Sequence, residues 1–439
     1  MSKKGKPVDA ADEAGEFLAR GEEFFSSNDF EEAIEEASKA IALNTGSASA
    51  HFLRGHCYFA TGQPDKALED ISEAIELEPE NARFHFLRGC IYGGSGFHAD
   101  ALNDFSATIS LDPTNATAYF NRGHAYAEQG RHGKALEDFD KALLLHPDNA
   151  PCYNSRGISC GAEGRHEEAI RDFSIAIVLW PECAAPYLNR GNALCILRRH
   201  EEALKDFNTA IDLDHGNVFA YIDRGYCRLY LSLPDEAMED AEKAISLEPS
   251  DPLAYMLRAT IHWHNCRQEE AIADFSAALK IDPQNTSAYE KRGYAYLARE
   301  ELDAAMADFN AVLEIVPENA NAYVGRGEAR RVRGLYDEAI ADCDRALEIS
   351  PQHFNAYSSR GESYRRKGLY DEAIADFNRA LELRPKMLNS ILSRGKAYMA
   401  KGLHDEAIAD CRKALEISPD LDDEWALELK DNGLVRQLG

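Results

Sequence analysis

The chain repeats one pattern of apolar and polar positions along most of its length. In "AYFNRGHAYAEQG" (118–130), Tyr119 and Tyr126 flank Arg122 at spacings that put aromatic residues on one face of a helix. In a second kind of segment, such as "EEAIRDF" (167–173), apolar residues stand three and four positions apart. The two kinds of segment alternate, so the pattern predicts pairs of helices joined by short turns.

The predicted helix pair recurs every 34 residues, and an arginine marks each repeat. Alanine follows each arginine after 13 residues and usually again after 20, where a small side chain lets two helices pack closely. Gly130 and its counterparts supply the left-handed conformation that ends a first helix, and Pro147 and its counterparts end a second helix. Twelve arginines keep this register: Arg20, Arg54, Arg88, Arg122, Arg156, Arg190, Arg224, Arg258, Arg292, Arg326, Arg360 and Arg394.

This combination of aromatic residues, Arg-Gly, alanines and proline resembles the tetratricopeptide repeat (TPR) family. The resemblance implies an all-α fold, a right-handed TPR superhelix (α-solenoid) of paired antiparallel helices, whose first helices line a concave groove. We expect a flexible N-terminal segment (1–13), twelve tandem units (14–421), and a C-terminal capping helix and tail (422–439). The units are 14–47, 48–81, 82–115, 116–149, 150–183, 184–217, 218–251, 252–285, 286–319, 320–353, 354–387 and 388–421.

The arginine departs from the family pattern, which usually has an apolar residue at this position. An acid stands 16 residues after each arginine, on the second helix: Glu36, Asp70, Asp104, Asp138, Asp172, Asp206, Asp240, Asp274, Asp308, Asp342, Asp376 and Asp410. The matching numbers predict a ladder of ion pairs within a unit or between neighbouring units. The alternative is a row of arginines that bind a partner in the groove, which would not need an acid for each arginine.

Composition narrows the class of partner. The 439 residues are 45% hydrophobic and 28% charged, which is ample for a folded core. The formal net charge of -28 opposes binding to nucleic acid. The sequence has no run of 18 apolar residues and no signal-peptide pattern, so we expect a cytoplasmic protein without a membrane span. Its ten irregularly spaced cysteines are expected to be reduced.

The units differ most beside the first-helix arginine, where the family resemblance places the groove. The candidate groove residues are Phe52, Phe86, Phe120, His124, Asn189, Asn192, Ile196, Tyr226, Tyr230, Trp263, Tyr294, Arg331, Arg365 and Arg366. Aromatic residues exposed in a concave surface favour an extended peptide or a helix of a partner protein. The alternative is packing between adjacent first helices. The arginines in "RRVRG" and "RRKG" either hold a carboxylate or phosphate, or lie at solvated helix ends.

The sequence therefore predicts a non-catalytic scaffold or adaptor that binds one or more proteins through peptide or helix segments. Two alternatives are a co-chaperone-like binder of acidic C-terminal tails through the Arg cluster, and a substrate-recognition arm for a separately encoded enzyme. The repeats leave no room for a catalytic domain, and no common catalytic motif occurs. We expect no cofactor. His262 and Cys266 share a helix face, but no fourth ligand is evident, so we expect no metal site. Self-association stays open.

Overall fold

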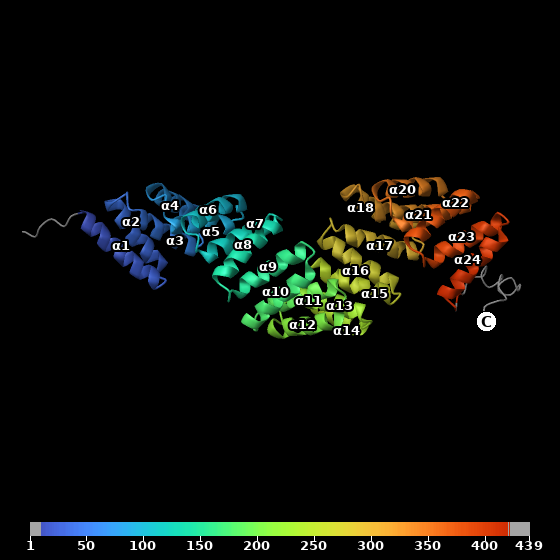
Figure 1. The fold of residues 1–439 in the computed structure, drawn as a ribbon, viewed down its shortest axis with the longest axis horizontal. Coiled ribbons are helices and arrows are strands. Elements are labelled where there is room, and N and C mark those ends of the chain that lie inside the picture. Colours follow the sequence, from blue (N-terminus) through green and yellow to red (C-terminus); the bar gives the residue numbers. More distant parts are fainter. Residues whose placement is uncertain (1–9, 420, 422–439) are drawn as a thin grey trace, which may run out of the picture. The chain divides into compact units, whose positions relative to one another are not determined.

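The computed structural model describes residues 10–419 and 421, and every regular element in that range is an α-helix (Figure 1). The chain divides into two compact units, Met1–Asp223 and Arg224–Gly439. The boundary falls within α13 (Val218–Tyr230). The capping helix expected in 422–439 lies outside the described residues.

Each unit is a stack of helix pairs. The helices before α13 are α1 (Ala10–Ser26), α2 (Phe30–Leu43), α3 (Ala48–Ala60), α4 (Pro64–Leu77), α5 (Ala82–Gly94), α6 (His98–Leu111), α7 (Ala116–Glu128), α8 (His132–Leu145), α9 (Ala150–Ala162), α10 (His166–Leu179), α11 (Ala184–Ile196) and α12 (His200–Leu213). Those after it are α14 (Pro234–Leu247), α15 (Pro252–His264), α16 (Gln268–Ile281), α17 (Thr286–Ala298), α18 (Leu302–Ile315), α19 (Ala320–Val332), α20 (Tyr336–Ile349), α21 (Phe354–Lys367), α22 (Tyr370–Leu383), α23 (Leu388–Ala400) and α24 (His404–Ile417).

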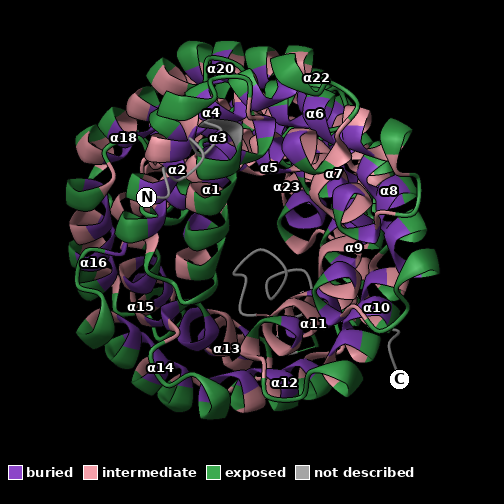
Figure 2. Cartoon of the chain, turned by 90° about the vertical axis from the view of Figure 1, so that its left-hand side faces the viewer, coloured by how far each residue is buried: buried purple, intermediate pink, exposed green. Residues whose placement is uncertain are grey.

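The helices contact mainly their neighbours in sequence and the first helices of adjacent pairs, which is typical of a solenoid. The predicted all-α solenoid of paired helices is thus confirmed. Within the first unit, α9 and α11 lie on the inner side of the curve, and α10 and α12 lie on the outer side (Figure 2). Side chains of first helices are therefore the ones that can line a concave surface.

Small residues allow the close packing of each pair. The alanine that follows each arginine after 13 residues is fully buried in every repeat: Ala33, Ala67, Ala101, Ala135, Ala169, Ala203, Ala237, Ala271, Ala305, Ala339, Ala373 and Ala407. On the first helix, Gly157 lies against the Phe173 ring, and a Cβ at Gly157 would come within 2.6 Å of it. Glycine is needed here because a real Cβ would force the two helices apart.

The first helix of each of the twelve described pairs is followed by a residue in the left-handed backbone conformation. Glycine occupies this position at Gly62, Gly96, Gly130, Gly164, Gly334, Gly368 and Gly402. Other residues adopt it at Asn28, Arg198, Ser232, Cys266 and Glu300, with φ between 57° and 63°. Arg198, Ser232, Cys266 and Glu300 thus stand where other repeats have the glycine that ends the first helix. These four residues bear a steric cost that glycine avoids.

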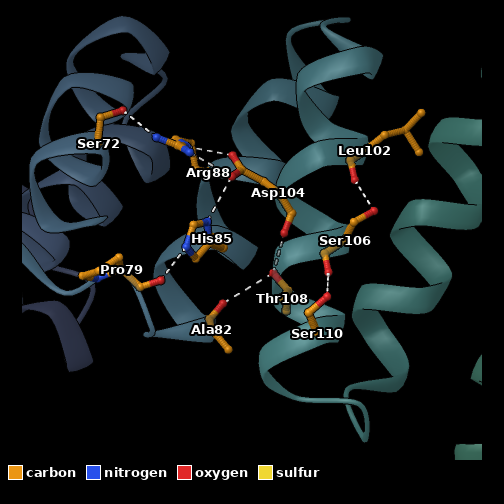
Figure 3. A network of polar contacts seen from close by, with 10 residues as sticks. All are labelled: Ser72, Pro79, Ala82, His85, Arg88, Leu102, Asp104, Ser106, Thr108 and Ser110. Atoms are coloured by element: carbon orange, nitrogen blue, oxygen red, sulfur yellow. Dashed lines mark hydrogen bonds and ion pairs between the residues drawn. The ribbon is translucent and has the colours of Figure 1, made fainter. Parts of the chain in front are cut away.

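The predicted ladder of ion pairs is confirmed in all twelve repeats. Each arginine binds the acid 16 residues later, with N–O distances of 2.6–2.8 Å. Figure 3 shows one case, in which Arg88 Nε and Nη2 donate to the two carboxylate oxygens of Asp104 at 2.7 and 2.9 Å. The third nitrogen, Nη1, donates to Ser72 Oγ of the preceding repeat at 3.2 Å.

The bond to the preceding repeat recurs along the ladder. The acceptors are Ser38, Ser72, Ser106, Asp140, Ser174, Ser276, Asn310, Asp344 and Asn378. In many repeats a Phe or Tyr three positions earlier also lies over the guanidinium, as Tyr153 does over Arg156 with 5.4 Å between the ring centroid and the Cζ atom. These arginines therefore stabilise the fold, because their guanidinium groups are engaged in contacts within and between repeats.

Candidate partner-binding groove

Two cavities in the second unit share Tyr294. The first, which we call the aromatic pocket, has a volume of about 370 Å³ and is lined by Thr260, Trp263, His264, Phe275, Lys291 and Tyr294. The second, the polar pocket, has about 450 Å³ and is lined by Tyr294, Val324, Glu328, Arg331, Asn355, Ser358, Ser359, Glu362, Arg366, Met387, Asn389 and Ser393. Most of these residues belong to the first helices α15, α17, α19, α21 and α23. We call the two pockets together the groove.

Rigid rings form much of the aromatic pocket. Phe275 is almost fully buried, whereas Trp263 keeps 38% of its surface exposed. The Tyr294 ring packs edge-on against Phe309 with 5.1 Å between centroids, which fixes its orientation. Burial raises the pKa of Tyr294 to about 12, because the charged phenolate would lose contact with water there. The pocket thus offers an apolar surface that is held in place before any partner arrives.

Ion pairs dominate the polar pocket. Arg331 Nε donates to Glu328 Oε2 at 2.9 Å, and Arg365 and Arg366 both donate to Glu362, with their Nε atoms at 2.8 and 3.0 Å from its oxygens. Burial opposes ionisation of Glu362, but the bonds from Arg365 and Arg366 outweigh it and hold the pKa of that carboxyl at about 2. Arg331 is therefore paired with its own glutamate, whereas Arg365 and Arg366 share Glu362, so much of the positive charge predicted for this cluster is offset by two glutamates.

The candidate aromatic residues of the first unit pack between helices. Phe52, Phe86 and Phe120 are half-buried. They contact Phe84, Phe105 and Phe139 respectively, with 4.8–6.0 Å between ring centroids. These contacts favour the packing interpretation for the three phenylalanines. His124 is exposed and borders a separate cavity of about 260 Å³, which Cys90, His98 and Asn121 also line.

The remaining candidates near the middle of the chain fall into two groups. Asn189 donates to Asn154 Oδ1 at 3.0 Å and Asn192 to Asp223 Oδ2 at 2.9 Å, so both amides are engaged within the fold. Tyr226 packs against the core cluster around Ala237. Ile196 and Tyr230, in contrast, are 62% and 73% exposed. Of all the candidates, the groove brings together Trp263, Tyr294, Arg331 and Arg366, with Arg365 beside them.

His262 and Cys266, which share a helix face in the sequence, and the intervening His264 have separate surroundings. His262 Nε2 lies 3.7 Å from Asp274 Oδ2, His264 lines the aromatic pocket, and Cys266 occupies the left-handed turn. The neighbours of the three side chains therefore differ, and only His264 takes part in the groove.

Lys291 is one of the groove residues that are absent from the candidates predicted from the sequence, as are Asn355 and Asn389. Lys291 directly precedes Arg292, at a position where the other repeats have no cation: Ala19, Leu53, Leu87, Asn121, Ser155, Asn189, Asp223, Leu257, Gly325, Ser359 and Ser393. A comparison of this register across the repeats would have singled it out.

Comparison with known proteins places these features in a family. Family models described as the tetratricopeptide repeat or TPR repeat match residues 48–81, 95–130, 116–149, 156–218, 267–298, 286–319, 318–386 and 355–422. No curated protein matches the chain significantly. In the part of the chain that the structure describes, none of the helices has both the length and the apolar character needed to cross a bilayer.

Several solved structures resemble this one. A chain of the APC/C hetero-tetramer Cut9–Hcn1 is 14% identical and matches with a TM-score of 0.54 over 97% of both chains, which shows a shared fold. Yeast Tom70 is 19% identical, with a TM-score of 0.46 over 89% of this chain and 96% of its own. A TPR protein from Parabacteroides merdae is 21% identical, with a TM-score of 0.48 over 57% of this chain and 98% of its own.

Proposed function

The chain belongs to the tetratricopeptide repeat family, and we propose that it is a non-catalytic scaffold that binds an extended segment of a partner protein in the groove. One observation carries the proposal: the aromatic and polar pockets meet at Tyr294, on five successive first helices. A segment of extended chain can follow such a surface across several repeats, because each repeat adds a row of side chains.

The two pockets suit different parts of such a segment. Asn355 and Asn389 are exposed in the polar pocket, and an amide side chain both donates and accepts hydrogen bonds, as a peptide backbone does. The aromatic pocket suits an apolar side chain, because Trp263 is a large exposed anchor beside buried rings. The combination favours one segment that is held by its backbone at one end and by an anchor residue at the other.

The ion pairs argue against the alternative of an acidic tail bound by the Arg cluster. Arg331 and Arg365 each direct Nε and Nη2 to one glutamate, so an incoming carboxylate would have to compete there with Glu328 and Glu362. A displaced, partly buried carboxylate would lose its hydrogen bonds, which offsets the gain from the new contact.

The experiment that tests the proposal is affinity capture from a cell lysate, followed by mass spectrometry. The variant Trp263→Ala/Asn389→Ala removes one exposed side chain from each pocket, so thermal unfolding should stay close to that of the wild type. We expect the captured partner proteins to be lost. The matched control is Trp180→Ala, which removes a 49% exposed tryptophan outside the groove. If the groove variant captures the same proteins as the wild type, the groove is not the binding surface.

A further inference from the structure

We propose that the aromatic pocket recognises a large apolar side chain together with an adjacent carboxylate, and that Lys291 binds this carboxylate. The ligand class is an acidic segment of a partner protein in which Trp, Phe or Leu stands next to Asp or Glu. The inference rests on the proposed function, since it names the kind of segment that the groove binds.

Lys291 places a positive charge among the residues that line the aromatic pocket. Its ammonium lies 3.4 Å from Thr260 Oγ1, and it forms no ion pair within the described range of the chain. Burial lowers the pKa of Lys291, and the through-space attraction of Glu290 is the smaller effect. The side chain of Lys291 is exposed to solvent, and the attraction of Glu290 offsets only part of the effect of burial, so an anion added beside the ammonium stabilises the charged form.

The other cations of the groove differ from Lys291 in having ion-pair partners. Arg331 and Arg366 line the polar pocket, and each is already paired with a glutamate. Lys291, in contrast, has no carboxylate within ion-pair distance among the described residues. In a chain with a formal net charge of -28, such a charge is the place where an anionic group is attracted rather than repelled.

Lys291 shares the aromatic pocket with the rings of a tryptophan, a phenylalanine and a tyrosine. Trp263, Phe275 and Tyr294 line the same pocket, whose volume of about 370 Å³ is at the lower end of the range for ligand pockets, about 300–1,000 Å³. An apolar side chain that fills this space excludes water from the ammonium, and exclusion of water strengthens its attraction to a neighbouring carboxylate. The two contacts are thus expected to reinforce each other.

The test is a selection from a random dodecapeptide phage library on the full chain, followed by titration of the enriched peptides. We expect enriched sequences that place an aromatic or large aliphatic residue next to Asp or Glu. Lys291→Met should weaken their binding by about ten-fold or more, because a charge-assisted hydrogen bond is lost. Lys291→Arg should retain most of the affinity. The matched control, Lys280→Met, changes an exposed lysine of α16 outside the pockets and should leave binding unchanged.

Three outcomes would overturn the inference: no enriched peptides, enriched peptides without acids, or equal binding by Lys291→Met and the wild type. Exchanging Asp for Asn in an enriched peptide should weaken its binding to the wild type but not to Lys291→Met. If Trp263→Ala abolishes binding while Lys291→Met does not, the groove function stands and the role of Lys291 is wrong. If Trp263→Ala binds every peptide as tightly as the wild type, the groove itself is the wrong surface.

Discussion

At the scale of single residues, the ladder of arginines and acids dominates the polar interior. Asp172 is only 5% exposed, and it accepts hydrogen bonds from Arg156 Nε at 2.8 Å and Nη2 at 2.7 Å. Arg156 also donates to Asp140 of the preceding repeat at 2.6 Å. A buried pair of this kind adds little net stability, but loss of one partner leaves a charge without compensation.

We therefore predict that Asp172→Ala lowers the free energy of unfolding by about 3 kcal/mol. The measurement is the shift of the urea unfolding midpoint, followed by circular dichroism. The control is Glu202→Ala, which removes an equally short but solvent-exposed bond to Arg199 and should leave the midpoint almost unchanged. Similar midpoints for Asp172→Ala and the wild type would contradict a structural role for the ladder.

The left-handed turns allow a second prediction at this scale. Cys266 is exposed with φ of 57°, a conformation that costs a residue with a Cβ about 1 kcal/mol or more. Cys266→Gly should therefore raise the free energy of unfolding by about 1 kcal/mol, measured by thermal unfolding under reducing conditions. The reverse change, Gly130→Ala at φ of 70°, should destabilise by a similar amount, since no atom lies within 4 Å of the added Cβ and only the backbone is strained. Effects of the same sign in both variants would show that strain in the turn is not the cause.

At the scale of helices, the contact between α9 and α10 depends on one glycine. A Cβ at Gly157 would lie 2.6 Å from the fully packed Phe173 ring. We predict that Gly157→Ala lowers the free energy of unfolding by about 2 kcal/mol, because α9 must move away from α10. The control lies in the same helix: a Cβ at Gly161 meets nothing within 4 Å, so Gly161→Ala should stabilise through helix propensity by about 0.5–1 kcal/mol. Chemical denaturation of both variants checks the difference in sign.

The helices could be predicted from the sequence, whereas the groove could be predicted only in part. Repetition explains the success, because the Arg156–Asp172 spacing and the turn at Gly130 recur along the chain and each repeat supports the same interpretation. The groove is formed by residues that differ between repeats. Whether such a side chain can contact a partner depends on the side chains that pack against it. The spacing of Glu328 and Arg331 on one helix already indicates an ion pair. The contact of Phe52 with Phe84, from another helix, has no such local signal.

At the scale of the whole molecule, interactions are short in range along the chain. Each helix pair contacts mainly the pairs before and after it, and the ladder links an arginine to its own repeat and the preceding one. Stability in such a stack is close to a sum over repeats and over contacts between neighbours. A change in one repeat should therefore loosen its surroundings without altering a distant binding surface.

This locality yields the last prediction. In Asp172→Ala, amide hydrogen exchange measured by mass spectrometry should speed up in α9, α10 and the adjacent α8 and α11, because the loss of the Arg156 pair weakens contacts there. Exchange in α17–α21 should stay as in the wild type, and peptides selected on the groove should bind with unchanged affinity below the unfolding temperature. Trp263→Ala should show the opposite result, with unchanged exchange in α9 and α10 but lost binding. Uniformly faster exchange in Asp172→Ala would mean that the chain unfolds as one cooperative block, and stability and binding could then not be separated by position.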